Sequence, residues 1–258
     1  MSITLKNVMI SNGKRVDIRT ENGAIAEIGS ISEKGIDCSG LVALAGFVDP
    51  HTHLRQPGFE SSETVMSGTR TAAKGGYVAV TAMANTNPVA DTAAIVEEVM
   101  ALGEASRYAF VQPIGAVTKG LGGSQLSDLA GMHNSNAQVR VFSDDGLCVF
   151  DDDLMKEALE KVLPFDGVIA QHAQDPTKTV GSQMNDGALS VELGLTGWPT
   201  VAEESIIKRD AELALETGSR LHVCHVTTGG GVEIIRWAKK QGARITAEVT
   251  PHHLLLNQ

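Results

Sequence analysis

Residues 47–55 read Phe-Val-Asp-Pro-His-Thr-His-Leu-Arg, an apolar strand that runs into two histidines separated by one residue. Side chains two positions apart in an extended chain point to the same face, so His51 and His53 are predicted to converge. Two imidazoles at one strand end can bind a single divalent transition metal. This segment therefore predicts both a strand and a metal site at its end.

Strand-like and helical stretches alternate from residue 41 onward. The apolar runs cover residues 41–48, 77–83, 108–114, 138–142, 167–170, 220–224 and 244–249. Helices are expected between them, for example over 91–104 and 199–217, the second with a proline near its start and Gly218 after its end. Strands that are apolar on both faces and alternate with helices indicate a parallel sheet.

The number of repeats favours an α/β fold of the TIM (β/α) barrel type over an open doubly wound sheet. No Gly-x-Gly-x-x-Gly follows the first strand, which argues against a dinucleotide-binding sheet. After Val249 no residues remain for an eighth strand. A barrel with seven strands would leave two unpaired edges, so we expect a barrel that lacks its last strand, from a chain that is truncated or continues past Gln258.

The first 46 residues differ in kind from the rest. Short alternating strands are expected over residues 3–10, 16–19 and 24–28, with turn signals at 11–14 and 21–23. We therefore predict two domains: a small β module over residues 1–46 and the incomplete metal-binding barrel over residues 47–258.

Composition excludes several classes of protein. The 258 residues carry a formal net charge of −10 without a run of lysine or arginine, which argues against nucleic acid and anionic membranes as partners. The sequence has three cysteines, an odd number, at the widely spaced positions Cys38, Cys148 and Cys224. A disulfide framework is therefore not expected. With neither a signal peptide nor a long apolar segment, the sequence predicts a cytoplasmic protein.

Further polar side chains follow the ends of other predicted strands. Asp145 follows the fourth strand, His172 the fifth, and His225 ends the sixth. Histidines from three strands at one barrel rim favour a shared metal centre over separate structural roles. Asp145 taken alone also fits an ordinary Asp-Gly turn.

Two residues are candidates for binding a substrate carboxylate. Arg55 offers a planar fork of donors on the same face as His53, unless it pairs with Glu60 or Glu63 instead. Asn85 follows the second predicted strand, where an asparagine fits either a carboxylate donor or a turn.

The remaining histidines are weaker candidates. His222 is interpreted as structural, because it lies three residues before His225 and should face the helices. His133 lies in a polar helix end and receives no role. His252 and His253 follow the seventh strand, where support for a ligand and a structural role are both open.

Six motifs in order resemble the class I dihydroorotases of the amidohydrolase superfamily. They are DPHTHLRQPG at 49–58, ANTNP at 84–88, SDDG at 143–146, QHAQD at 171–175, HVCHVTT at 222–228 and TAEVTPHHLLL at 246–256. The resemblance implies a metal-assisted enzyme of pyrimidine biosynthesis. Its reaction is the reversible ring closure of N-carbamoyl-L-aspartate to (S)-dihydroorotate.

The resemblance also implies roles for individual residues. His51 and His53 would bind one zinc ion and His172 and His225 a second, with Asp145 bridging the pair. Arg55 and Asn85 would bind the substrate's α-carboxylate. The sequence leaves the number of zinc ions, one or two, open. Ala84 stands where relatives often have proline.

Part of the family's pattern falls outside these residues. Its catalytic aspartate on the eighth strand would lie beyond Gln258, as would the tail that completes the N-terminal β module. We therefore expect the 258-residue chain alone to be weakly active or inactive, because loss of a positioned general acid–base costs about 10²–10⁴ in rate.

Two other functions remain as alternatives. A dihydropyrimidinase, hydantoinase or allantoinase would carry a carboxylated lysine on the fourth strand, whereas residues 138–145 contain no lysine. A non-catalytic subunit that scaffolds aspartate carbamoyltransferase would have lost metal ligands, which this chain keeps. A small-molecule substrate is expected, and the sequence leaves open whether the chain forms a homo-oligomer or binds aspartate carbamoyltransferase.

Overall fold

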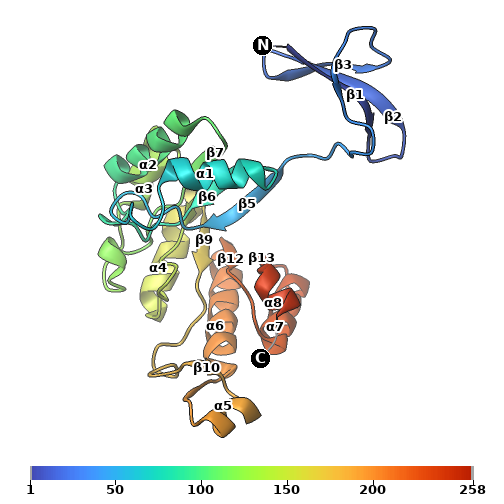
Figure 1. Ribbon diagram of the computed structural model, residues 1–258. Coiled ribbons are helices and arrows are strands. Elements are labelled where there is room, and N and C mark those ends of the chain that lie inside the picture. The colour runs from blue at the N-terminus through green and yellow to red at the C-terminus, as the bar shows by residue number, and fades with distance from the viewer. Residues whose placement is uncertain (1, 257–258) are drawn as a thin grey trace. The chain divides into compact units, whose positions relative to one another are not determined.

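The structure is a computed structural model that describes residues 2–256, and the chain divides into two compact units, Met1–Phe47 and Val48–Gln258 (Figure 1). No helix within the described residues combines the length and apolar character needed to cross a membrane.

The N-terminal unit is a four-stranded sheet. Its strands are β1 (Ser2–Met9), β2 (Arg15–Glu21), β3 (Ala24–Gly29) and β4 (Ile36–Asp37), in the order β3-β2-β1-β4. The β1–β2 and β2–β3 pairs are antiparallel, and β4 pairs with β1 in parallel. A small core of Val8, Ile18 and Cys38 lies on one face. Asp17 is buried beside it, where its carboxylate accepts hydrogen bonds from Lys6 and from the backbone of Asn7 and Ile31.

The second unit is an α/β fold whose strands neighbour one another in chain order. One sheet holds β5 (Phe47–Thr52), β6 (Tyr77–Ala82) and β7 (Phe110–Pro113). The other holds β8 (Val141–Phe142), β9 (Val168–Gln171), β12 (Arg220–Val223) and β13 (Arg244–Ala247). A parallel bridge between Gly115 and Phe142 connects β7 to β8, so the two sheets continue one another.

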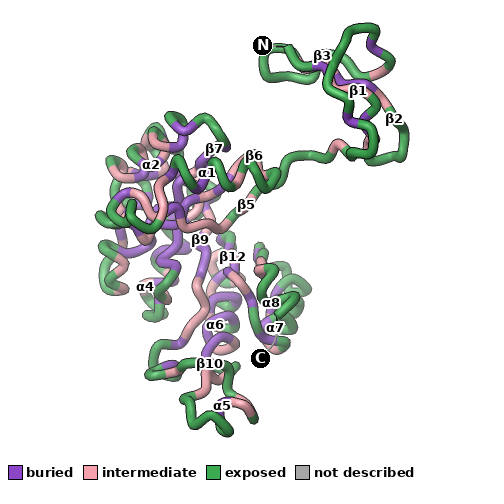
Figure 2. The backbone as a smooth tube through the Cα atoms, in the orientation of Figure 1, coloured by how far each residue is buried: buried purple, intermediate pink, exposed green. Residues whose placement is uncertain are grey.

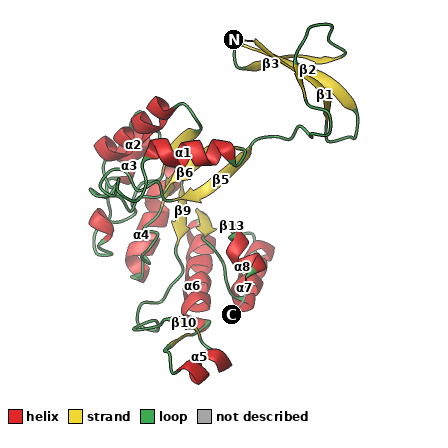
Figure 3. Cartoon of the chain, viewed as in Figure 1, coloured by secondary structure: helices red, strands yellow, loops and turns green. Residues whose placement is uncertain are grey.

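Helices lie between these strands, as the sequence pattern predicts (Figure 3). They are α1 (Val65–Lys74), α2 (Ala93–Ser106), α3 (Leu129–Asn134), α4 (Asp152–Val162), α6 (Val201–Thr217), α7 (Gly229–Lys240) and α8 (Pro251–Leu255), with short 3-10 turns at Lys119–Leu121 and Leu163–Phe165. An excursion between β9 and α6 carries β10 (Met184–Asn185), α5 (Ala188–Leu193) and β11 (Gly197–Trp198). The sequence analysis missed this excursion because its elements are too short to show a period.

Two strand boundaries differ from the predictions for local reasons. The first strand of the second unit begins at Phe47 rather than at residue 41, because Leu41 and Ala43 hydrogen-bond to Met9 at the edge of the N-terminal sheet. The fourth strand is shortened to Val141–Phe142, and Gln138 adopts a positive φ of 46°, outside the extended region that regular strands occupy.

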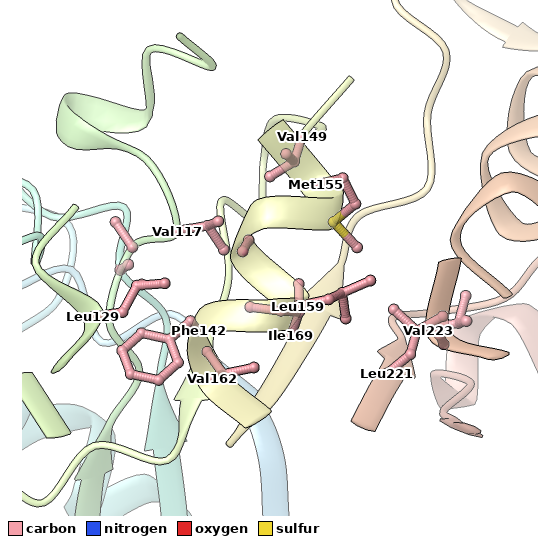
Figure 4. Packing of buried hydrophobic residues seen from close by; sticks show 14 of the residues in the cluster. Val117, Leu129, Phe142, Val149, Met155, Leu159, Val162, Ile169, Leu221 and Val223 are labelled. Atoms are coloured by element: carbon pink, nitrogen blue, oxygen red, sulfur yellow. The ribbon is translucent and has the colours of Figure 1, made fainter. Parts of the chain in front are cut away.

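The core of the second unit lies between its strands and helices (Figure 2). Helix α4 is typical: Asp151 caps its first turn by accepting from the Leu154 amide, and one face then buries Met155, Leu159 and Val162. These side chains meet the strand residue Ile169 (Figure 4). Burial contributes about 1.5–3 kcal/mol for each large apolar side chain, so this packing holds the strand ends in place.

Candidate metal centre

Five side chains from four strand ends meet in one cluster. His51 lies in β5 and His53 just after it, and Asp145, His172 and His225 follow β8, β9 and β12. Their ligand atoms form two groups, one of His51, His53 and Asp145 and one of Asp145, His172 and His225. The atoms within each group lie within 4.8 Å of one another. All five are residues that the sequence predicted as metal ligands.

Asp145 joins the two groups through its two carboxylate oxygens. Its Oδ2 lies 3.4 Å from His51 Nε2 and 3.2 Å from His53 Nε2. Its Oδ1 lies 3.2 Å from His172 Nδ1 and 3.1 Å from His225 Nε2. The carboxylate is almost fully buried, with 4% of the residue exposed. A carboxylate in this position has one oxygen available to each histidine pair.

The backbone aims these side chains in different ways. His51 and His53 point the same way because they are two residues apart in extended chain. His225 instead has a positive φ of 33°, a backbone conformation rare for residues other than glycine. Rare conformations of this kind persist where the surroundings over-determine them, and they concentrate at functional sites.

Three of the histidines are held on their far side by a polar partner. His53 Nδ1 lies 2.9 Å from Asn85 Oδ1, and His172 Nε2 lies 2.8 Å from Gln174 Oε1. His51 Nδ1 lies 2.5 Å from Glu248 Oε1. In each case one ring nitrogen is occupied by the partner and the other faces Asp145, which is the arrangement typical of histidines that bind metal.

The electrostatics of the cluster favour positive charge. Burial opposes ionisation of His51, but Asp145, Cys224 and Glu248 outweigh it and raise the pKa of His51. Burial likewise opposes charge on His172, yet contacts led by Asp145 raise its pKa. The four histidines in turn overcome the effect of burial on Asp145 and lower its pKa. Without a metal, protonated imidazoles supply the positive charge beside Asp145. A divalent cation bound between the histidines would supply that positive charge instead.

The donor set fits a transition metal. Imidazole nitrogens and carboxylate oxygens suit zinc and its neighbours, and a site with two or three protein ligands per ion leaves positions open for substrate. The cluster brings four imidazoles and one carboxylate together, with the ring nitrogens that face inward aimed at the same oxygen atoms. Residues 2–256 therefore contain a well-formed candidate metal centre.

The two predicted substrate-binding residues take different positions. Asn85 directs its side-chain oxygen to His53, and its Nδ2 lies beside Gly146, the residue after Asp145. Arg55 has a positive φ of 59° in the loop after β5. Among the described residues its guanidinium forms no ion pair, so neither Glu60 nor Glu63 competes for it.

Two of the weaker histidine candidates have their partners outside the five-residue cluster. His133 stacks on Phe165 at 4.1 Å between ring centroids and hydrogen-bonds to a backbone carbonyl, which is a structural role. His253 Nδ1 lies 3.1 Å from Thr250 Oγ1, the N-cap of α8. Within residues 2–256 the side chain of His252 forms no hydrogen bond, ion pair or ring contact.

Sequence reasoning missed Glu248 and Gln174 at this site. Glu248 lies just after β13, and its carboxylate lies between His51 and His222, the latter at 3.3 Å. Burial would raise the pKa of Glu248, but these two histidines outweigh it and lower the pKa to about 2. It lies near the end of the strand predicted over residues 244–249, as the other site residues lie near strand ends, and this was the one available signal.

The consecutive parallel strands and the histidine–aspartate cluster at their carboxyl ends define an α/β protein with a candidate metal centre. A family model described as Dihydro-orotase-like matches residues 40–230. The chain belongs to this dihydroorotase-like family.

Individual relatives agree with this assignment. The chain is 60% identical to the dihydroorotase of Leifsonia xyli subsp. xyli, covering 100% of this chain and 60% of that protein. It is 56% identical to the dihydroorotase of Streptomyces coelicolor, covering 99% of this chain and 61% of the relative. The chain therefore spans about 60% of the length of the curated relatives it matches.

Solved structures share the fold. The L-hydantoinase (dihydropyrimidinase) of Arthrobacter aurescens superposes with a TM-score of 0.79 at 22% identity, covering 99% of this chain and 59% of that one. At this identity the likeness shows the fold alone.

Proposed function

We propose that the protein to which this chain belongs is a dihydroorotase, which interconverts (S)-dihydroorotate and N-carbamoyl-L-aspartate. The observation that carries the proposal is Asp145, which places one oxygen against each of two histidine pairs in a chain of the dihydroorotase-like family. Because the chain spans about 60% of the relatives' length, the activity of the whole protein is inferred rather than read from this part.

We also propose that the second unit is the greater part of a TIM barrel. Its seven strands neighbour one another in chain order from β5 to β13, which is the order of staves in such a barrel. The candidate ligands all lie at or just after the carboxyl ends of these strands, where barrel enzymes have their active sites. The fold shared with the hydantoinase supports the same arrangement.

The metal is proposed to be zinc. His51 and His53 would hold one ion and His172 and His225 a second, with Asp145 between them. A bound zinc ion supplies Lewis-acid activation of the ring amide and of water. The protein's own residues then have positioning roles: Asp145 keeps both histidine pairs on one centre, and the outer partners fix which ring nitrogen faces inward.

Arg55 and Asn85 are proposed to bind the substrate's carboxylate. The guanidinium of Arg55 has no competing ion pair among the described residues, so its planar set of donors can meet a carboxylate with two parallel hydrogen bonds. Asn85 uses its oxygen for His53, which leaves its amide hydrogens as the donors available to a ligand. Together they would hold dihydroorotate with its ring amide toward the metal centre.

A hydantoinase or dihydropyrimidinase is the competing assignment. Those enzymes would require a carboxylated lysine on the fourth strand, whereas β8 and its flanks, residues 138–145, contain none and Asp145 holds the central position instead. The absence of that lysine and the presence of Arg55 favour a substrate that carries its own carboxylate.

Turnover by the full-length protein tests the proposal. Dihydroorotate should be hydrolysed, whereas dihydrouracil and hydantoin, which lack the carboxylate, should be turned over at least 100-fold more slowly. Dialysis against a chelator should abolish the activity and added zinc should restore it. Equal turnover of hydantoin, or activity that survives removal of the metal, would contradict the assignment.

The wider setting follows from the same proposal. The substrate is a small molecule, and the three cysteines are free, which fits a reducing cytoplasm. A homo-oligomer and a complex with aspartate carbamoyltransferase both remain compatible with the described surface, and size-exclusion chromatography with and without the transferase distinguishes them.

A further inference from the structure

Glu248 is a second carboxylate, besides Asp145, that contacts the imidazole of a residue of the candidate metal centre. Its Oε1 lies 2.5 Å from His51 Nδ1, on the side of the ring away from Asp145. Its backbone is fixed at both ends, since its amide donates to Val223 and its carbonyl accepts from Val226. The side chain is 16% exposed. A largely buried carboxylate is thus held against one ligand ring.

We propose that Glu248 is a positioning residue for His51, an inference that rests on the metal centre proposed above. A carboxylate can only accept a hydrogen bond, so its contact with Nδ1 places the ring proton on that nitrogen. The lone pair of Nε2 is then directed toward Asp145, 3.4 Å away, and His53 Nε2, 3.3 Å away. Glu248 acts through His51, and among the described residues it forms no hydrogen bond or ion pair with the cluster's other members.

The partner of His51 differs chemically from the partners of the other ligands. His53 and His172 contact the neutral amides of Asn85 and Gln174, whereas His51 contacts an ionised group. A hydrogen bond to a charged acceptor is about twice as strong as a neutral one and makes the ring a more basic ligand. His51 should therefore depend more on its outer partner than the other two histidines do.

His222 extends the arrangement by one residue. Its Nε2 lies 3.3 Å from Glu248 Oε2, and its Nδ1 lies 2.8 Å from Thr246 Oγ1 on the adjacent strand. Glu248 is therefore placed between two imidazoles, with one oxygen toward each. This gives His222, which the sequence analysis interpreted as structural and helix-facing, a connection to the metal centre.

A direct metal-ligand role for Glu248 is the alternative that the experiment must separate. Its carboxylate, His51 and Cys224 offer ligand atoms that lie within 4.8 Å of one another. Binding an ion there would require His51 to use Nδ1, which would leave Nε2 unused beside Asp145. The position of Nε2 between Asp145 and His53 favours the positioning role.

Zinc affinity of the full-length protein tests the inference without relying on activity. We expect Glu248→Gln to weaken zinc binding by about 10-fold and Glu248→Ala by about 100-fold, measured by competition with a chromophoric chelator. The glutamine can still accept from Nδ1 through its oxygen, so it should rescue part of the loss. Glu216→Gln, which removes a surface ion pair with Lys156, is the matched control and should bind zinc as the wild type does.

The outcomes are distinguishable. If the wild-type protein binds no zinc, the proposed metal centre fails. If it binds zinc and Glu248→Gln binds equally well, the centre stands and the positioning role is wrong. Melting of the metal-free proteins checks folding, and His222→Asn, with a smaller expected loss of affinity, gives a milder test should Glu248→Ala unfold. A sulfur-to-cobalt charge-transfer band in the Co²⁺-loaded protein would indicate ligation through Cys224 and overturn the proposal.

Discussion

Replacing Asp145 by asparagine should uncouple the stability of the protein from zinc. The carboxylate lies 3.1–3.4 Å from all four histidines, so the substitution removes the only anionic ligand from both halves of the centre while keeping its shape. Each half is left with two neutral imidazoles and one amide oxygen. We expect zinc affinity to fall at least 100-fold, beyond the range of 10 to 100 that loss of an outer partner typically causes.

The magnitude follows from the linkage between binding and folding. At free zinc equal to 100 times the dissociation constant, binding stabilises the folded protein by about 2.7 kcal/mol. For a folding unit of about 150–250 residues that corresponds to a rise in Tm of roughly 5–11 °C, and a longer protein shows a smaller rise. With affinity reduced 100-fold at the same free zinc, the stabilisation falls to about 0.4 kcal/mol and the rise to roughly 1–2 °C.

Differential scanning fluorimetry with buffered zinc measures these shifts in the full-length protein. The neighbouring substitution Asp144→Asn is the control, because Asp144 is equally buried but hydrogen-bonds to Val117 and Thr118 and not to the histidines. It should lower Tm with and without zinc by the same amount, leaving the zinc-dependent rise intact. A full zinc-dependent rise in Asp145→Asn would refute the placement of the ion between the histidine pairs.

Three further predictions concern substrate, acid and packing. Arg55→Ala should raise KM for dihydroorotate by about 10- to 100-fold, the value of a charge-assisted hydrogen bond, and steady-state kinetics should show no such change for uncharged dihydrouracil. Asp17, whose pKa is lowered from 3.8 to about 2 chiefly by Lys6, should stabilise the protein above pH 4 and lose that contribution as the pH falls toward 2. The Asp17→Asn protein should therefore show a weaker loss of stability over this interval in acid unfolding curves. Ile207→Ala, at a fully buried position of α6, should cost about 2–5 kcal/mol in urea unfolding, and a smaller change would indicate a site that collapses around the cavity.

The fold was predictable where a single periodic signal dominates. Helix α6 was expected over 199–217 and forms at Val201–Thr217, because the single proline near its start, its long apolar period and the glycine after its end agree. The strand expected at 138–142 was not placed correctly, since the left-handed conformation of Gln138 depends on its tertiary setting. Leu41 shows the same limit: its apolar character fits a barrel strand, yet it hydrogen-bonds at the edge of the N-terminal sheet.

The candidate ligands could be predicted because they share one rule, a polar residue where a strand ends, and parallel strands bring such ends together. Their outer partners obey no comparable rule. Glu248 and Gln174 are ordinary polar residues in the sequence, and only the three-dimensional arrangement places each against the unused nitrogen of a histidine. The sequence separation of the partners, 197 positions for His51 and Glu248 against 2 for His172 and Gln174, follows no spacing that a motif could record. Which ring nitrogen of a histidine faces the metal is therefore set by the folded site and not by a sequence motif. Substitutions of the outer partners test that site more sharply than substitutions of the ligands themselves.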